Sequence, residues 1–254
     1  PAAPIIAIVF AALSIIPVGM TSLKPPPPPE SASIAVVRAW RISPVGVAGM
    51  LAVGGLSMMV AGFAPIHATA SGYSQGQVSV LMVSMQIGTI LVQLPFGWIS
   101  DRTDRRYVLV AASLLVIAGG VSASLTIGAP FAVLVAIFMV WGGATESIYS
   151  ISSAHANDRA SKADLVALSS TMLFAWSLSG FLIPGMATAL TAVFGTQAFM
   201  YVAVAIAAAF CLFVLWRLSQ SPPAQGETGF APMSAQAPLP AELAFAPDDD
   251  NQGP

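Results

Sequence analysis

Charge is what this sequence lacks most. Only 8% of its 254 residues are charged and 56% are hydrophobic, whereas soluble domains have about 25% charged and about 45–50% apolar residues. So few charges cannot cover the surface of a water-soluble globule of this length. The composition therefore excludes an ordinary soluble domain and indicates a chain that lies in a membrane.

Cysteine and histidine are nearly absent as well. The single cysteine, Cys211, lies within an apolar run, and there are only two histidines, which excludes a disulfide framework and a zinc spacing. We expect no metal and no cofactor. A net charge of −2 without a basic stripe argues against a nucleic-acid partner. No Ser or Cys nucleophile stands beside a base and no pair of intramembrane Asp residues occurs, so we expect no catalytic residue and no enzyme.

Long apolar segments dominate what is present. A membrane-spanning helix needs about 20 mostly apolar residues. Open sheets cannot lie in hydrocarbon, and the alternating polarity of a closed barrel is missing. The sequence therefore predicts an all-α membrane protein. Seven segments are candidate spans: Ala2–Val18, Val45–Ile66, Val78–Ile99, Tyr107–Ile127, Phe131–Tyr149, Leu165–Leu190 and Ala198–Leu218.

Lys and Arg occur only in every second connection between these spans and at the end of the last span. The loops around 67–77, 128–130 and 191–197 contain no Lys or Arg. Cytoplasmic loops are enriched in both residues, so the pattern predicts a multi-pass membrane protein with a cytoplasmic C-terminus. We expect the membrane to be a bacterial inner (plasma) membrane. The nine cations are Lys24, Arg38, Arg41, Arg102, Arg105, Arg106, Arg159, Lys162 and Arg217.

The domain organisation follows from these segments. Residues 1–20 form a lone transmembrane helix, which we expect to be the last helix of something longer, because a signal peptide would have a basic start. Residues 21–43 form a cytoplasmic linker whose five consecutive prolines favour a semi-rigid spacer, with a recruitment motif as the alternative. Residues 44–218 form a six-helix bundle. Residues 219–254 form a cytoplasmic tail with too few apolar residues to fold.

The turn between the second and third spans of the six-helix block carries the densest charge. Gly97 permits close approach of a neighbouring helix, and Asp101 can accept hydrogen bonds at the start of another helix. Asp104 stands where a tight turn can need a left-handed residue. Three arginines can pair with a carboxylate or with lipid phosphates, or they only fix the orientation of the chain. We define the signature turn as Gly97, Asp101, Arg102, Asp104, Arg105 and Arg106.

The signature turn resembles the Gly-x-x-x-Asp-Arg-x-Gly-Arg-Arg motif of the major facilitator superfamily, which joins the second and third helices of a six-helix half. Five positions match, and Asp104 replaces the usual Gly. The order of one helix, a long linker and six helices is similar to spans six to twelve of such a transporter. The resemblance covers residues 1–218 and implies the C-terminal six-helix half of a twelve-helix fold, with one extra transmembrane helix.

The resemblance also implies a function. It predicts a secondary active transporter that moves a small organic solute by alternating access, with membrane lipids, the solute, the missing N-terminal half and, if transport is coupled, protons as partners. The signature turn would be a conformational latch that pairs with the start of the sixth span, near Asp164 and Leu165, in one state. The alternative is a structural or sensory membrane protein that keeps the scaffold without transporting.

Polar groups inside the spans are the candidate solute or proton contacts. Glu146 is the only acid inside a predicted span, about one turn from its cytoplasmic end, so it either binds a proton or solute or pairs with Arg102 or Arg159. Gln86 and Gln93 share one helix face, which can bind a solute or a neighbouring helix.

Other residues have weaker assignments. Trp141 and Tyr149 flank the acid along its helix and serve as interfacial anchors or in helix packing, with cavity lining as the alternative. Pro184, followed by Gly185, is expected to kink the sixth span, either as a gating hinge or as static packing. His155 is expected in a cytoplasmic loop, as a solvated residue or, alternatively, as a pH sensor. The glycine pairs 54–55 and 142–143 suggest a three-plus-three repeat, although small residues also serve ordinary helix packing.

Overall fold

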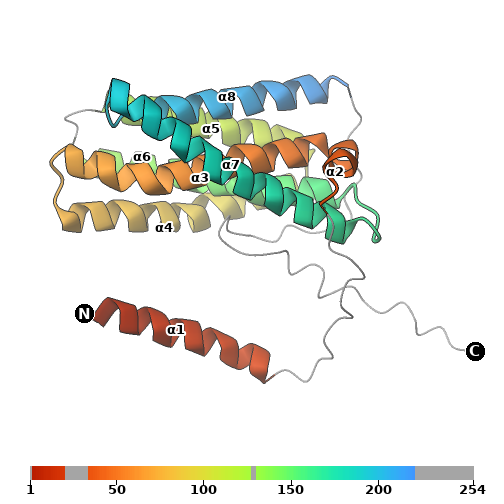
Figure 1. Cartoon of the computed structure of the whole chain (residues 1–254), viewed down its shortest axis with the longest axis horizontal. Coiled ribbons are helices and arrows are strands. Elements are labelled where there is room, and N and C mark those ends of the chain that lie inside the picture. The colour runs from red at the N-terminus through yellow and green to blue at the C-terminus, as the bar shows by residue number, and fades with distance from the viewer. Residues whose placement is uncertain (1, 21–33, 127–129, 221–254) are drawn as a thin grey trace, which may run out of the picture. The chain divides into compact units, whose positions relative to one another are not determined.

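The computed structural model describes residues 2–20, 34–126 and 130–220, and these form helices joined by short connections, without strands (Figure 1). Backbone groups inside a membrane must be satisfied within the segment, which favours helices. The helices are α1 (Ala2–Gly19), α2 (Val36–Ile42), α3 (Pro44–Ala70), α4 (Gln75–Ser100), α5 (Arg105–Leu125), α6 (Phe131–Asn157), α7 (Leu165–Phe194) and α8 (Ala198–Leu218).

Six of these helices, α3 to α8, are long and apolar enough to cross a membrane. The predicted all-α membrane fold with a six-helix block is therefore confirmed. Helix α1 belongs to a unit separate from the one that holds α2–α8. It is apolar over its 18 residues, and its assignment as a further transmembrane helix stays a prediction, as do the domain boundaries.

The predicted end of the fifth span at Tyr149 is wrong. Helix α6 continues to Asn157, eight residues further. The extension is rich in serine, which hydropathy does not recognise as part of a span. Its side chains are nevertheless buried, because α6 packs on α3, α4 and α5 at once. Because the helix is longer, every polar group on it lies further from the helix end than the sequence predicted.

The helices pack in a pattern that relates α3–α5 to α6–α8. The most extensive contacts of α4 are with α6, the most extensive contacts of α7 are with α3, and α5 lies against α8. In a three-plus-three repeat, α3 corresponds to α6 and α4 corresponds to α7. The contact of α4 with α6 is therefore equivalent to the contact of α7 with α3. The packing supports the repeat that the two glycine pairs suggested.

The glycine pairs lie at these equivalent contacts. A Cβ at Gly54 would lie 2.2 Å from the carbonyl oxygen of Trp176 on α7, and a Cβ at Gly143 would lie 2.2 Å from that of Gly88 on α4. Neither site has room for a side chain. Small residues that permit close backbone approach are typical of helix packing in membranes.

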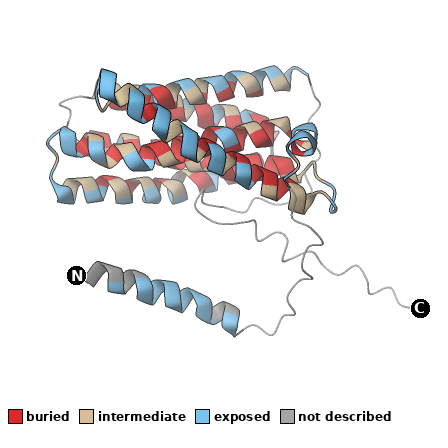
Figure 2. Ribbon diagram, viewed as in Figure 1, coloured by how far each residue is buried: buried red, intermediate tan, exposed pale blue. Residues whose placement is uncertain are grey.

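Burial separates the inside of the bundle from its outer faces. Figure 2 shows the buried residues along the faces where the helices meet, and the exposed residues on the outer surfaces of α4, α7 and α8. The largest fully buried side chains include Trp141, Phe138 and Phe199. Exposed apolar side chains on a span face lipid or another helix rather than water, so they fit a membrane environment.

Helix α7 remains continuous through Pro184 and Gly185. The carbonyl oxygen of Pro184 accepts a hydrogen bond from the hydroxyl of Thr188 (2.8 Å). A Cβ at Gly185 would meet no atom within 4 Å. The role of this pair as a hinge stays a prediction.

Candidate functional site

The signature turn joins the end of α4 to the start of α5. Asp101 follows the last residue of α4, and Asp104 precedes α5 and accepts a hydrogen bond from the backbone N–H of Arg106 (3.0 Å). Asp104 has φ −61°, so the expected left-handed conformation is wrong. Aspartate in place of glycine therefore serves as a helix N-cap.

The guanidinium of Arg106 binds the same carboxylate. Its Nη2 atom lies 2.6 Å from Oδ2 of Asp104, and its Nη1 donates to the carbonyl oxygen of Arg217 on α8 (3.3 Å). Burial of Asp104 favours its neutral form, but the hydrogen bonds and charge of Arg106 outweigh burial and lower the pKa of this carboxyl group. Asp104 is therefore ionised at neutral pH, and the pair ties α5 to α8.

Arg105 connects the turn to the end of α6. Its Nε atom lies 2.6 Å from Oδ2 of Asp158, the residue that follows α6, and its Nη1 donates to the hydroxyl of Ser100 (3.2 Å) and lies 3.4 Å from Oδ1 of Asp101. The side chains of Arg105 and Asp158 are only 7% and 4% exposed. This is a buried ion pair with several hydrogen bonds, and removal of one partner would leave an uncompensated charge.

Asp164, the latch partner expected at the start of α7, pairs with an arginine outside the signature turn. Asp164 lies 2.5 Å from Nη2 of Arg38 on α2, whereas Arg105 binds Asp158. In the conformation described, the turn is thus joined to the end of α6. Arg102 stands apart, because its guanidinium lies over the ring of Trp98, 4.1 Å from the centroid, and donates to the carbonyl oxygen of the same residue.

Glu146 lies near the middle of α6 and is half-buried. Eleven residues of α6 follow it before the helix ends at Asn157, so its expected position one turn from the end is wrong. Arg102 and Arg159 have other partners: Trp98 for the first and His155 for the second. A carboxylate Oε1 atom of Glu146 instead accepts a hydrogen bond from the hydroxyl of Ser57 on α3 (3.0 Å).

A cavity brings several predicted residues together at this carboxylate. It has a volume of about 50 Å³ and lies between α3, α4 and α6. Glu146 and Gln86 line it with Thr89, which shares the glutamine's helix face. The complete lining is Ser57, Val60, Ala61, Met85, Gln86, Thr89, Gly142, Thr145 and Glu146. We call this the Glu146 cavity.

Gln93, Trp141 and Tyr149 do not line the Glu146 cavity. The amide of Gln93 donates to the hydroxyl of Ser150 and to the backbone carbonyl of Glu146 (3.5 Å), so it binds α4 to α6. Trp141 is fully buried and stacks on Phe199, with ring centroids 6.1 Å apart. It is a core residue rather than an interfacial anchor.

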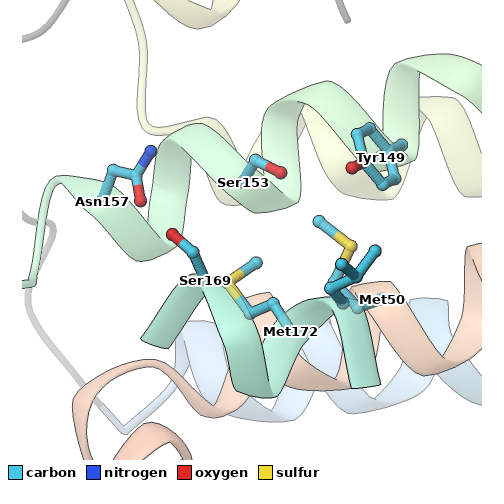
Figure 3. Close-up of a pocket in the computed structure, with 7 residues that line it drawn as sticks. Met50, Tyr149, Ser153, Asn157, Ser169 and Met172 are labelled. Carbon is cyan, nitrogen blue, oxygen red and sulfur yellow. The ribbon is translucent and has the colours of Figure 1, made fainter. Parts of the chain in front are cut away.

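Tyr149 lines a second cavity, between α3, α6 and α7 (Figure 3). Its other lining residues are Met50, Ser153, Asn157, Ser169, Met172 and Leu173. We call this the Tyr149 cavity.

His155 was expected in a solvated loop, but it lies on α6 and is only 3% exposed, and its Nδ1 accepts a hydrogen bond from Arg159 (2.9 Å).

Sequence reasoning missed several residues of the site. Ser57 is the only polar side chain between Pro44 and Ile66, so its isolation was a usable signal. Ser153 was missed because it lay outside the predicted span, whereas Ser169 lay inside the span Leu165–Leu190 and was not singled out. Asp158 was missed because no spacing relates it to Arg105, 53 residues earlier.

Comparison with known proteins gives consistent results. The model of the Major Facilitator Superfamily matches residues 45–247. An uncharacterized MFS-type transporter of Yersinia pestis (strain Pestoides F) is 29% identical over 163 residues, which are 63% of this chain and 41% of that protein. The uncharacterized MFS-type transporter YcaD of Salmonella typhi is 24% identical over 193 residues, which are 76% of this chain and 49% of that protein. No solved structure shows a significant match. The chain thus spans half or less of the length of these relatives.

Proposed function

Because the chain belongs to the major facilitator superfamily, we propose that α3–α8 form one six-helix half of a secondary transporter that moves a small organic solute by alternating access. The match over residues 45–247 and the two MFS-type relatives support transport. The second half of the solute site would come from six further helices. We expect the arginine-bearing loops to face the cytoplasm of a bacterium, as the distribution of cations predicts.

The observation that carries this proposal is the Glu146 cavity. A carboxyl group within a membrane-spanning helix is costly and marks a solute path or a proton relay by default. Here the carboxylate faces a hollow shared by three helices and is accompanied by hydroxyl and amide groups from α3 and α4. We propose that Glu146 takes up a proton or binds the solute during transport, with Gln86 and Thr89 as further contacts.

The contacts of the signature turn would then differ between the two conformations of the transporter. The Arg105–Asp158 pair and the Arg106–Asp104 pair link α5 to the ends of α6 and α8. We propose that these links hold the state described here and that Arg105 exchanges partners in the opposite state. Such an exchange needs two discrete arrangements of the same helices, which interface salt bridges can provide.

Untargeted mass spectrometry can test transport of a solute whose identity is unknown. Cells that express the full protein are compared with cells that carry an empty vector and with cells that express Glu146→Gln. We expect at least one small organic compound to change its intracellular level only with the unchanged protein. If no compound differs between the three, although the protein is present in the membrane, the structural or sensory alternative is favoured.

A further inference from the structure

The Tyr149 cavity has the size and lining of a water site. Its volume is about 20 Å³, and a single water needs about 10–15 Å³ and two to four polar partners. Figure 3 shows Tyr149, Ser153 and Asn157 along one face of α6, opposite Ser169 on α7. Four polar side chains therefore surround a space that fits one water molecule.

Three of these groups can take such a partner. The side chains of Tyr149, Ser153 and Ser169 are only 7%, 8% and 8% exposed. Within the described parts of the chain, none of their hydroxyls hydrogen-bonds to another protein group. Buried hydroxyl groups are paired in most structures, and ordered water supplies the partner where protein does not. Bound water would satisfy all three.

The cavity lies on a polar stripe that leads to Glu146. Along α6, Glu146, Ser150, Ser153 and Asn157 stand at i, i+4, i+7 and i+11, so they share one face of the helix. Tyr149 lies beside the same face. The stripe ends at Asn157, the last residue of α6, next to Asp158 and the signature turn. No comparable stripe runs the other way, because residues 131–144 of α6 carry no charged or hydroxyl side chain.

We propose that the Tyr149 cavity holds ordered water and that this water connects Glu146 with the end of the bundle that carries the signature turn. A proton released by the Glu146 carboxyl is accepted by water on the stripe, and a water molecule releases a proton beyond Asn157, so the water is unchanged overall. The proton route rests on the proposed function of Glu146. The water site rests on the cavity alone.

Hydroxyl-radical footprinting tests the water site in the full protein. Radicals made from bound water oxidise adjacent methionine sulfur to the sulfoxide. Met50 and Met172 line the cavity at 2% and 5% exposure, and Met59 and Met200, both at 0%, are buried elsewhere and serve as controls. We expect Met50 and Met172 to be oxidised several times faster than the controls, on the order of threefold or more. Equal rates at all four residues would overturn the water site.

Two substitutions at one position sharpen this result. Ser153→Leu fills the cavity, whereas Ser153→Ala removes one hydroxyl and leaves the space. We expect the excess oxidation of Met50 and Met172 to be lost in Ser153→Leu and kept in Ser153→Ala. Excess oxidation that survives Ser153→Leu in a folded protein would contradict the placement of water in this cavity.

The proton route has its own measurement, which does not depend on transport. The infrared carboxyl stretch of protonated Glu146 is identified as the band lost in Glu146→Gln, and its shift is followed after transfer to D₂O. We expect this shift to be slower in Ser153→Leu than in Ser153→Ala. An equal rate in both would overturn the route, even if footprinting confirms the water.

Discussion

Helices α3 and α6 occupy equivalent positions in the two halves of the bundle but differ in chemistry. Both use a glycine pair to approach a neighbouring helix closely, α3 against α7 and α6 against α4. Along α3 the only polar side chain near the glycines is Ser57, and Met58 follows the glycine pair of α3 by three residues, as Glu146 follows that of α6. Packing is thus repeated, while the polar groups are concentrated on one helix. The repeat provides the scaffold, and departures from it mark the site.

The largest effect on stability is expected where α6 ends in a buried charge pair that α3 lacks. Arg105→Ala removes the guanidinium that pairs with the buried Asp158, and breaking such a pair costs about 3–5 kcal/mol of unfolding free energy. Arg102→Ala is the control, since an exposed arginine over Trp98 contributes about 1 kcal/mol or less. Thermal unfolding in detergent measures both. Equal losses would show that the Arg105 pair is not the main link.

The equivalence of the two glycine pairs predicts similar costs on both helices. In Gly54→Ala and Gly143→Ala the new methyl group would overlap a backbone carbonyl, and we expect about 1–3 kcal/mol of destabilisation in each case. Gly62→Ala is the matched control on α3, because a Cβ there meets nothing within 4 Å. A large cost at only one glycine pair would break the equivalence of α3 and α6.

A smaller effect is expected at the hydroxyl through which α3 reaches Glu146. Ser57→Ala removes the 3.0 Å hydrogen bond to the carboxylate, and interhelical hydrogen bonds in membranes contribute about 0.6 kcal/mol on average. We therefore expect a slight loss of stability in detergent. Ser113→Ala is the control, since its hydroxyl bonds only to the carbonyl oxygen of Leu109 on its own helix. A larger loss at Ser113 would argue against the contact between α3 and α6.

The N-cap residues of α3 and α5 are expected to respond differently to pH. Helix α3 is capped by neutral Ser43 and α5 by ionised Asp104. Because the folded-state pKa of Asp104 is lowered, its contribution to stability is complete above the unfolded-state pKa of about 3.9 and is lost as the pH falls through the lower folded-state value.

We expect Asp104→Asn, which can still cap the helix, to reduce the acid-dependent loss of stability, whereas Ser43→Ala leaves it unchanged. Unfolding midpoints between about pH 5 and about pH 2 measure this. The same acid dependence in Asp104→Asn as in the unchanged protein would show that Asp104 does not titrate with folding.

Much of the fold was predictable because membrane helices are long and apolar. The six spans and the site of the signature turn followed from hydropathy, charge and one motif. The depth of Glu146 did not, because the serines after Tyr149 do not read as part of a span until their packing is known. The partner of Arg105 was likewise beyond the sequence, since it depends on where two distant helices end.

The central claim is that Glu146, and not its counterpart on α3, takes part in transport. It is tested most directly by the flux of the solute identified by mass spectrometry, measured in vesicles for Glu146→Gln and Met58→Gln. Both variants place glutamine three residues after a glycine pair. The account predicts that flux is lost in Glu146→Gln and retained in Met58→Gln. Undiminished flux in Glu146→Gln would contradict it.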